Sequence, residues 1–441
     1  MYVIYTNVMN VRDVNEALLR GGIEERGVLP HLEGLAEMKF QFAVDFGLNA
    51  LPEEPGIIMV RGARQYGKST WLEQRLKETI KTYGPGSAFY LNGDTLRDAD
   101  HLLDAIRQLV PMFARKARVR RLFIDEVTSV RDWALVLKRL VDARELTRVL
   151  VVTTGSNAHD LRRGVERLPG RKGKLARTEY LFTPISYRAF HDACADTLGD
   201  DTLVAYAMSG GSPVALASLA SRRQLPQYVI EIVRDWIYGA CAASGRPRSS
   251  LVAVMEAIDR RGGTPIGQAK LAREAGLANN TVAAGYVELL ADLNVLGISH
   301  AWDPHKGIRI RRRPAKFPMI NLLAAIAWSG DRIRTINDFR TLDPQVQGKW
   351  WEWLIAQELW RRAAIAGHAQ PEQLRHWISK EHELDFVLDG GHFIEVKRGS
   401  PTPFDFSWFP NHFPNAHLTI VSNTSFETDQ ITALSFEDFL L

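Results

Sequence analysis

Cysteine is scarce in this chain of 441 residues, which contains only Cys194 and Cys241. The two lie far apart in the sequence, and neither belongs to a CxxC pair or has a histidine at metal-binding spacing. This pattern excludes a disulfide framework and gives no indication of a zinc site. It is typical of a protein that works in a reducing compartment.

Long hydrophobic runs are also missing. The longest, INLLAAIAW, has about half of the ~20 residues that a membrane-spanning helix needs. The N-terminal stretch MYVIYTNVMNVRD lacks the basic region and following apolar run of a secretory signal. We therefore expect a cytoplasmic protein with no membrane partner.

Neither sign of charge dominates, because 55 Lys and Arg face 51 Asp and Glu, for a net charge of +4. Hydrophobic residues make up 46% and charged residues 24%, as in ordinary globular proteins, and the length suits roughly three domains of about 150 residues each. The local balance is more informative. Residues 246–315 carry a net charge of +5, which suits contact with phosphates, and residues 316–441 carry −5, which suits binding of cations.

A glycine-rich loop in GIIMVRGARQYGKSTWLEQRLKETI follows a short apolar strand and leads into an amphipathic helix. The loop fits the pattern GxxxxGK[ST], whose backbone N–H groups surround nucleotide phosphates at a positive helix N-terminus. Lys68 is expected to reach the β- and γ-phosphates of ATP, and Ser69 to bind Mg²⁺. The residues expected to contact the nucleotide are Gly62, Ala63, Arg64, Gln65, Tyr66, Gly67, Lys68, Ser69 and Thr70.

A second apolar strand, in RRLFIDEVTSV, ends in two acids, Asp125 and Glu126. On its own, this pattern also fits a buried strand that ends in solvated carboxylates. Beside the loop described above it is typical of a Walker B strand, in which Asp125 holds Mg²⁺ through water and Glu126 orients the attacking water.

Polar residues also follow the apolar run in TRVLVVTTGSNAHDL, where Ser156, with Thr154 or Asn157 beside it, is placed to sense the γ-phosphate. A basic stretch comes next. It is open to three interpretations: a solvated loop, a nucleic-acid contact, or the source of an arginine finger, which in trans would require a second copy of the chain. The basic residues are Arg162, Arg163, Arg167, Arg171, Lys172, Lys174 and Arg177.

The order of the motifs GARQYGKST, LFIDEV, TTGSNA, LPGRKG and SGGSP resembles the bacterial and archaeal AAA-type ATPases whose C-terminal domain is nuclease-like and of unassigned function. The resemblance covers the chain from about residue 45 onward. It implies ATP and Mg²⁺ as cofactors and a parallel sheet with the P-loop strand central. It also implies that Arg171 is the arginine of the LxGR motif, and that the turn from Gly210 to Pro213 belongs to a helical lid over the nucleotide.

Residues 246–315 have the pattern of a winged helix-turn-helix, with a short helix, a turn at Gly276, and a second helix starting near Asn279. The wing would be basic, through Arg309, Arg311, Arg312 and Arg313. The second helix carries Glu288 and Asp292 but no Lys or Arg, and its only base-contacting candidates are Asn279, Asn280 and Thr281. The pattern favours non-specific binding to the DNA backbone, or an architectural domain, over sequence-specific regulation.

Residues 383–398, ELDFVLDGGHFIEVKR, form a predicted antiparallel hairpin around the turn DGG. This register places Asp385 directly opposite Glu395, where the two carboxylates repel each other. A solvated outer face with an unimportant charge pattern is the alternative interpretation. If the face is buried, a cation is expected between the two acids.

The acids also follow the order of a PD-(D/E)xK nuclease site, with Glu352 of the helix in GKWWEWLIAQELWRRAA as the third carboxylate and Glu358 as the alternative. Glu352, Asp385 and Glu395 would hold Mg²⁺, and Lys397 would position or activate water. The family resemblance supports this assignment. Leu384 replaces the proline of the motif's name, which leaves cleavage undecided.

The predicted fold is α/β: a P-loop AAA-type ATPase with a helical lid, a winged helix domain, and an α/β restriction-endonuclease-like C-terminal domain. The leading hypothesis is an ATPase that gates a Mg²⁺-dependent nuclease acting on DNA. The alternatives are a nucleotide-controlled switch in defence or toxin regulation, whose nuclease fold binds DNA or protein without cleaving, and a DNA-binding regulator. The expected boundaries are 1–45 for an N-terminal lead, 46–185 for the ATPase core, 186–243 for the lid, 244–315 for the winged helix and 316–441 for the nuclease-like domain.

Overall fold

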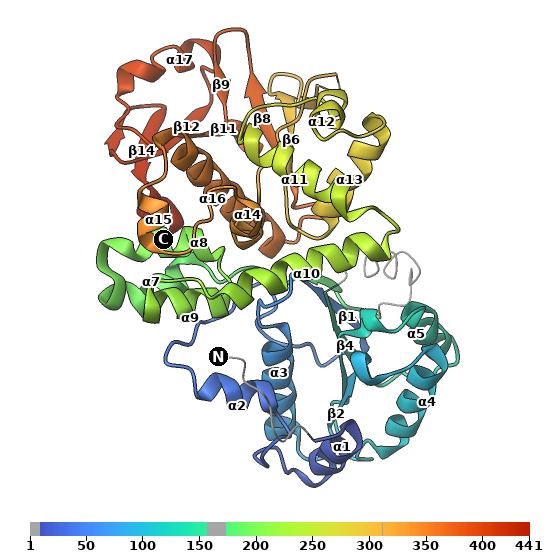
Figure 1. Ribbon diagram of the computed structural model, residues 1–441. Helices are drawn as coiled ribbons and strands as arrows, with labels where there is room; N and C mark the ends of the chain where they lie inside the picture. Colours follow the sequence, from blue (N-terminus) through green and yellow to red (C-terminus); the bar gives the residue numbers. More distant parts are fainter. Residues whose placement is uncertain (1–8, 157–172, 311) are drawn as a thin grey trace. The chain divides into compact units, whose positions relative to one another are not determined.

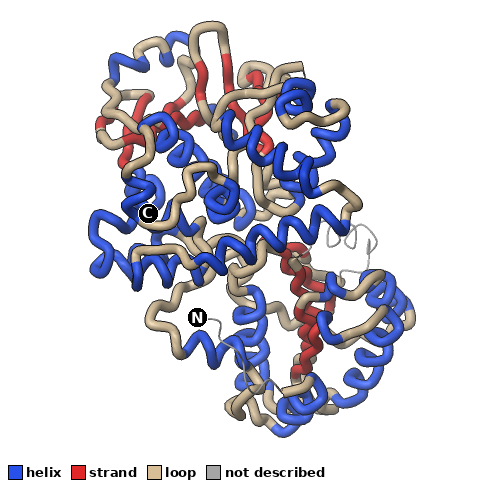
Figure 2. The backbone as a smooth tube through the Cα atoms, viewed as in Figure 1, coloured by secondary structure: helices blue, strands red, loops and turns tan. Residues whose placement is uncertain are grey.

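The computed structural model describes residues 9–156, 173–310 and 312–441 (Figures 1 and 2). The chain divides into two compact units, with the boundary between Thr183 and Pro184. No helix among the described residues combines the length and the apolar character needed to cross a membrane.

Within its described residues, the first unit is built on a five-stranded parallel sheet in the order β2-β3-β4-β1-β5. The expectation of a parallel sheet is confirmed, and the P-loop strand β1 lies inside it, between β4 and β5. The strands read as continuous apolar runs because both faces of the sheet are buried. Their bounds are β1 (Gly56–Arg61), β2 (Ala88–Asn92), β3 (Arg121–Asp125), β4 (Leu150–Gly155) and β5 (Glu179–Leu181).

Helices cover both faces of this sheet (Figure 1). α3 (Lys68–Tyr83) lies on one face, and α4 (Ala99–Leu109) and α5 (Trp133–Asp142) lie on the other, where their apolar sides pack against β2 and β3 in one core cluster. Because the strands are parallel, their carboxyl ends meet at one edge, which is where ligand sites form in such sheets. The loop after β1 and the acids after β3 are thereby brought to the same edge.

The segment before residue 46, expected to be a short lead, forms two helices that belong to the first unit. The helix expected near VNEALLRGG is present as α1 (Val11–Arg20), capped by Asn10 at its start and by Gly21 at φ 83° at its end, and α2 (Pro30–Ala36) follows. From α1, the buried Asn15 side chain donates to the carbonyl of Tyr90 and accepts from its N–H, both at 2.8 Å. A side chain therefore satisfies the free backbone groups of the edge strand β2.

The second unit begins with helices where the lid was predicted. Its SGGSP turn requires glycine, because Gly210 and Gly211 have φ of 57° and 72° and a Cβ on Gly211 would lie 2.5 Å from the Cβ of Pro184. The α-helices described in the second unit are α7 (Tyr187–Leu198), α8 (Thr202–Ser209), α9 (Pro213–Arg222), α10 (Gln227–Ala243), α11 (Arg248–Arg261), α12 (Gln268–Glu274), α13 (Asn280–Asp292), α14 (Leu322–Trp328), α15 (Ile336–Arg340), α16 (Pro344–Ile365), α17 (Phe409–His412) and α18 (Phe436–Leu440).

Helices α12 and α13 occupy the positions expected for the helix-turn-helix, and Gly276 between them has φ 63°. Asn279 was a candidate for base contact, but its side chain caps α13 by accepting from the N–H of Val282 at 3.0 Å. The capping contact gives Asn279 a structural role at this helix N-terminus. Arg311, one of the wing arginines, lies outside the described residues.

Strands of the second unit form two sheets, ordered β7-β6-β8-β9 and β10-β11-β12-β14-β13 among the described residues. β6 and β7 make the antiparallel hairpin expected for a wing, but β6 also pairs in parallel with β8, so this hairpin shares a sheet with a strand of the C-terminal segment. The strands are β6 (Ile298–Asp303), β7 (Ile308–Arg309), β8 (Gln373–Ile378), β9 (Glu383–Leu384), β10 (Phe386–Val387), β11 (His392–Val396), β12 (His417–Ser422), β13 (Phe426–Glu427) and β14 (Ile431–Ser435).

Candidate nucleotide site and carboxylate cluster

The loop between β1 and α3 curls around its own lysine. Gln65 and Gly67 take left-handed backbone conformations, with φ of 67° and 94°, and α3 starts directly after Gly67. The buried Lys68 ammonium donates to the carbonyls of Gly62 at 3.0 Å and Ala63 at 2.9 Å. The helix N-terminus and the loop N–H groups form the kind of surface that binds phosphate.

Gly62 has a steric reason to be glycine. A Cβ at this position would lie 2.9 Å from both the Cβ and the carbonyl oxygen of Phe182, which follows β5. Phe182 in turn donates its N–H to the carbonyl of Arg61 at 2.7 Å. Phe182, directly after β5, therefore fixes the base of the loop at the end of β1.

Asp125 ends β3 as predicted, buried at 4% exposure. Its carboxylate accepts from the Thr154 hydroxyl at the end of β4 and from the N–H of Glu126. Glu126 itself has a left-handed backbone at φ 44°. Gly93 accommodates this turn, because a Cβ there would lie 2.3 Å from the carbonyl oxygen of Glu126.

The Glu126 carboxylate lies among three other predicted site residues. Its Oε2 accepts from both the N–H and the hydroxyl of Ser156, each at 3.0 Å, and its Oε1 is 3.9 Å from Nζ of Lys68. Arg64 donates to the Ser156 hydroxyl at 3.4 Å. Burial lowers the pKa of Lys68, and the charges of Glu126 and Asp125 oppose that effect.

The donor set of this site suits Mg²⁺, which usually binds one or two carboxylates together with phosphate oxygens and water. Ser69 and Thr70 stand in the first turn of α3, and Asp125 supplies a carboxylate at the end of β3, which β4 separates from β1. Arg171 and Asn157, also predicted for this site, lie outside the described residues.

Sequence reasoning missed an interacting pair one helical turn beyond Ser69, formed by a buried glutamate and a half-buried histidine. Glu73 of α3 lies 2.6 Å from Nδ1 of His31 and accepts the N–H groups of His31 and Leu32, each at 3.0 Å. Burial raises the pKa of Glu73; burial lowers that of His31, but the hydrogen bond and charge of Glu73 outweigh it and raise it. No local motif marks the pair, because 42 residues separate its members.

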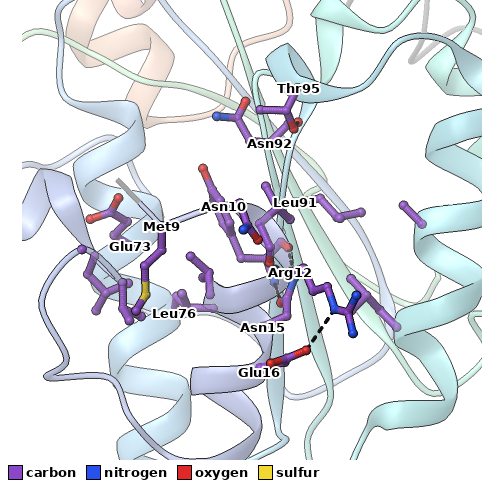
Figure 3. Close-up of a pocket in the computed structure, with 18 of the residues that line it drawn as sticks. Met9, Asn10, Arg12, Asn15, Glu16, Glu73, Leu76, Leu91, Asn92 and Thr95 are labelled. Carbon is purple, nitrogen blue, oxygen red and sulfur yellow. Dashed lines mark hydrogen bonds and ion pairs between the residues drawn. The ribbon is translucent and has the colours of Figure 1, made fainter. Parts of the chain in front are cut away.

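This pair borders a cavity of about 720 Å³ with mostly apolar walls. Figure 3 shows residues of α1, α3 and β2 around it, including Asn15, Glu16, Glu73, Leu76 and Leu91. Glu73 belongs to α3, the helix that starts at Lys68, so this cavity and the candidate nucleotide site lie along the same helix.

In the second unit the predicted hairpin has the predicted register. Pairing of Phe386 with Ile394 and of Val387 with Phe393 places Asp385 opposite Glu395. The solvated alternative does not hold for this face, since Glu395 is only 4% exposed. Two backbone N–H groups also satisfy the acids: that of Asp385 donates to Glu395 at 3.1 Å, and that of Val396 donates to Asp385 at 3.0 Å.

Positive charge is present at the opposed pair, and the chain itself supplies it with a separate lysine for each acid. Nζ of the buried Lys316 lies 2.9 Å from Oδ1 of Asp385, 3.5 Å from Oε1 of Glu352 and 2.5 Å from Oε1 of Glu383. Lys397 lies 2.5 Å from Oε1 of Glu395, on the other side of the opposed pair. The sequence did not identify Lys316, which stands 69 residues before Asp385.

Glu352 reaches this carboxylate cluster from α16, and Glu358 does not. Glu358, six residues further along the helix, is buried against Arg361 at 2.7 Å and Arg362 at 2.6 Å. The structure thus brings together Glu352, Asp385, Glu395 and Lys397, beside a cavity of about 470 Å³.

Burial dominates the protonation of these acids. Together with the charge of Asp385, it raises the pKa of Glu352 to about 7 and that of Glu395 to about 8, against the opposing charges of Lys316 and Lys397. The surrounding carboxylates raise the pKa of Lys316 well above its usual value, although burial acts to lower it. Lys316 is therefore a permanent cation at neutral pH.

The cluster as it stands does not fit a divalent metal. Three carboxylates are suitable ligands for Mg²⁺, but an ammonium already lies against two of them. In the described ranges, 9–156, 173–310 and 312–441, no group of three or more His, Cys, Asp or Glu is arranged to hold a metal ion. Metal binding by Glu352, Asp385 and Glu395 stays a prediction from the sequence.

Comparison with known proteins bears on the first unit. Residues 54–191 match the model of a family described as an AAA domain. Over 109 residues the chain is 32% identical to the uncharacterized protein MJ1637 of Methanocaldococcus jannaschii, a match that covers 24% of this chain and 22% of that protein. The matched segment thus spans about a fifth of the relative's length.

Two solved structures are similar at lower identity. The Walker-type ATPase paby2304 of Pyrococcus abyssi has a TM-score of 0.43 at 14% identity, over 69% of this chain and 94% of that chain. The ORC1 protein of Aeropyrum pernix, solved in complex with DNA, has a TM-score of 0.33 at 16% identity, over 75% and 95%. At these scores nothing about this chain follows from either. The family match, the loop and the parallel sheet together support an AAA-type ATPase.

Proposed function

We propose that this protein binds ATP with Mg²⁺ at the loop of residues 62–70, hydrolyses it, and uses the nucleotide state to control the activity of residues 184–441. The observation that carries the proposal is the placement of Glu126, whose carboxylate is held by Ser156 beside the loop lysine Lys68. A carboxylate in this position can orient a water molecule for in-line attack on the γ-phosphate.

Each residue of the site has a separate task. The Lys68 ammonium now donates to two loop carbonyls, and it would donate to phosphate oxygens instead when the nucleotide binds. Its charge is therefore already buried where the phosphates would lie. Ser69 and Asp125 would hold Mg²⁺, which neutralises charge on the phosphates when it is bound. Thr154 fixes the Asp125 carboxylate. Ser156 holds the Glu126 carboxylate, which orients the attacking water. Arg171 as an arginine finger in trans would require a second copy of the chain.

For the second unit, the leading hypothesis remains a Mg²⁺-dependent nuclease-like domain acting on DNA, gated by ATP. It is supported by the convergence of Glu352, Asp385, Glu395 and Lys397 beside one cavity. Binding to DNA would be non-specific and through its phosphates, since residues 246–315 are basic and Asn279 is used as a helix cap. The cytoplasmic location inferred from the sequence belongs to the same proposal.

A second candidate is a nucleotide-controlled switch whose nuclease fold binds DNA or protein without cleaving it. Lys316 favours this candidate, because its ammonium neutralises carboxylates that a nuclease would offer to a metal ion. The two candidates share the ATPase and differ only in what the second unit does.

The experiment that tests the proposal measures ATP turnover and cleavage of plasmid and linear DNA with Mg²⁺ or Mn²⁺, with and without ATP. Wild type, Glu126→Gln and Asp385→Ala are compared. Cleavage that disappears in Asp385→Ala and responds to ATP or to Glu126→Gln supports the gated nuclease. ATP turnover without cleavage under any metal supports the switch, and absence of ATP turnover by the wild type would refute the ATPase itself.

A further inference from the structure

We propose that Lys316 takes the place of a divalent cation in the carboxylate cluster and keeps metal out of it for as long as its side chain stays there. The inference rests on the proposed function only for the location of the cluster. The inference is tested by measuring metal binding to the cluster, which does not require that the protein cleaves DNA.

The first argument is the geometry around Nζ of Lys316. It donates to Asp385 at 2.9 Å and to Glu352 at 3.5 Å, forms an ion pair with Glu383 at 2.5 Å, and the residue is 3% exposed. An ammonium is a compact point charge, and here three carboxylates surround it. A metal ion bound by Asp385 and Glu352 would have to displace it.

The second argument is that the backbone fixes Lys316 in this place. Its N–H donates to the carbonyl of Ser299 at 2.9 Å, and its carbonyl accepts from the N–H of Ser299 at 2.8 Å, which attaches it to β6. The preceding Ala315 accepts from the N–H of Ile266, just before α12, at 2.8 Å. The cation is therefore built into the same scaffold as the basic helical and hairpin segment.

The third argument is that this segment also covers the cluster. Gly263, between α11 and α12, has φ 62°, and a Cβ there would lie 2.1 Å from Oε2 of Glu352. Opening the cluster to a metal thus requires Lys316 to withdraw.

The test uses full-length protein and Mn²⁺ alone, whose binding is followed by electron paramagnetic resonance. Lys316→Met removes the ammonium while keeping most of the side-chain volume. We expect Mn²⁺ to bind this variant at least about tenfold more tightly than the wild type, a difference of about 1.4 kcal/mol. The gain should disappear in the double variant Lys316→Met/Asp385→Asn. Lys349→Met, which removes a nearby lysine bound to Asp259 instead, is the matched control and should give no gain.

A second variant covers the case in which Lys316→Met fails to fold. Glu383→Gln weakens the shortest contact of Lys316 but keeps Glu352, Asp385 and Glu395, and it should also raise Mn²⁺ affinity. Wild-type affinity equal to that of either variant would overturn the proposal. If wild type and variant both bound Mn²⁺ tightly and Asp385→Asn abolished that binding, the exclusion of metal by Lys316 would be refuted while the nuclease hypothesis gained support. Failure of this proposal can therefore be distinguished from failure of the nuclease hypothesis.

Discussion

Replacing Asn15 by Leu tests whether the N-terminal helix α1 completes the nucleotide-binding sheet. The Asn15 amide makes two hydrogen bonds of 2.8 Å to the backbone of Tyr90 and a third of 2.9 Å to the carbonyl of Val11. Leucine has nearly the same shape but no polar atoms. The change therefore leaves the N–H and the carbonyl of Tyr90 buried against an apolar side chain.

The cost follows from these unsatisfied groups. A buried backbone donor or acceptor that loses its partner costs roughly 1–3 kcal/mol, so two of them together cost about 2–6 kcal/mol in free energy of unfolding. This is a large share of the ~5–15 kcal/mol that holds a typical domain together. Part of the loss should be offset, because leucine burial in this largely apolar region is itself favourable.

The assay is urea unfolding at equilibrium, combined with hydrogen exchange of the Tyr90 amide. The matched control is Glu16→Ala on the exposed side of the same helix, where the ion pair with Arg12 lies in solvent and should contribute less than about 1 kcal/mol. An Asn15→Leu variant within about 0.5 kcal/mol of the wild type, with the Tyr90 amide still protected, would refute the assigned role of α1.

Three further predictions concern single side chains. Lys68→Ala removes the only charge that the loop buries among its own carbonyls, and it should abolish binding of a fluorescent ATP analogue that the wild type retains; unchanged affinity would contradict the site. Glu126→Gln should keep that binding and lower ATP turnover on the order of 100-fold or more, which single-turnover kinetics would measure. Burial lowers the pKa of His376 to about 3. Because this lies below the unfolded value of ~6.5, the stability it contributes is complete above pH 6.5 and is lost as the pH falls toward 3, by about 3 kcal/mol at pH 4. His376→Asn should flatten the slope of unfolding free energy between pH 6.5 and 4, and an unchanged slope would count against it.

Features that short stretches of chain define were predicted well from the sequence. The loop at Gly62 to Ser69 and the acids after β3 depend on neighbours within a few residues, and the structure has them where the motifs indicate. The hairpin register follows from a tight turn in which Gly390 has φ 74°, since a turn of fixed length leaves one pairing for the strands. Side-chain alternation then determines which residues oppose each other.

Contacts between distant parts of the chain were not predictable in this way. Asn15 and Tyr90 are 75 residues apart, and His31 and Glu73 are 42 apart, with no motif at either position. An asparagine in a helix is usually a weakly unfavourable surface residue, and nothing in its local sequence shows that it will satisfy the edge of a sheet. The parallel pairing of β6 with β8 has the same origin, because parallel strands are joined by long connections that a local pattern does not specify.

The opposed acids Asp385 and Glu395 show where the limit of such reasoning lies. Their register establishes a need for positive charge at one point, since like charges at this separation repel and burial makes the repulsion stronger. Any cation meets that need, and the motif directed attention to a metal ion. In this structure the ammonium of Lys316 meets it at Asp385 and that of Lys397 meets it at Glu395. Lys316 comes from a residue that its local sequence assigns to the end of a basic segment. A charge requirement can therefore be located from sequence, whereas the group that satisfies it depends on which distant segment the fold brings to that point.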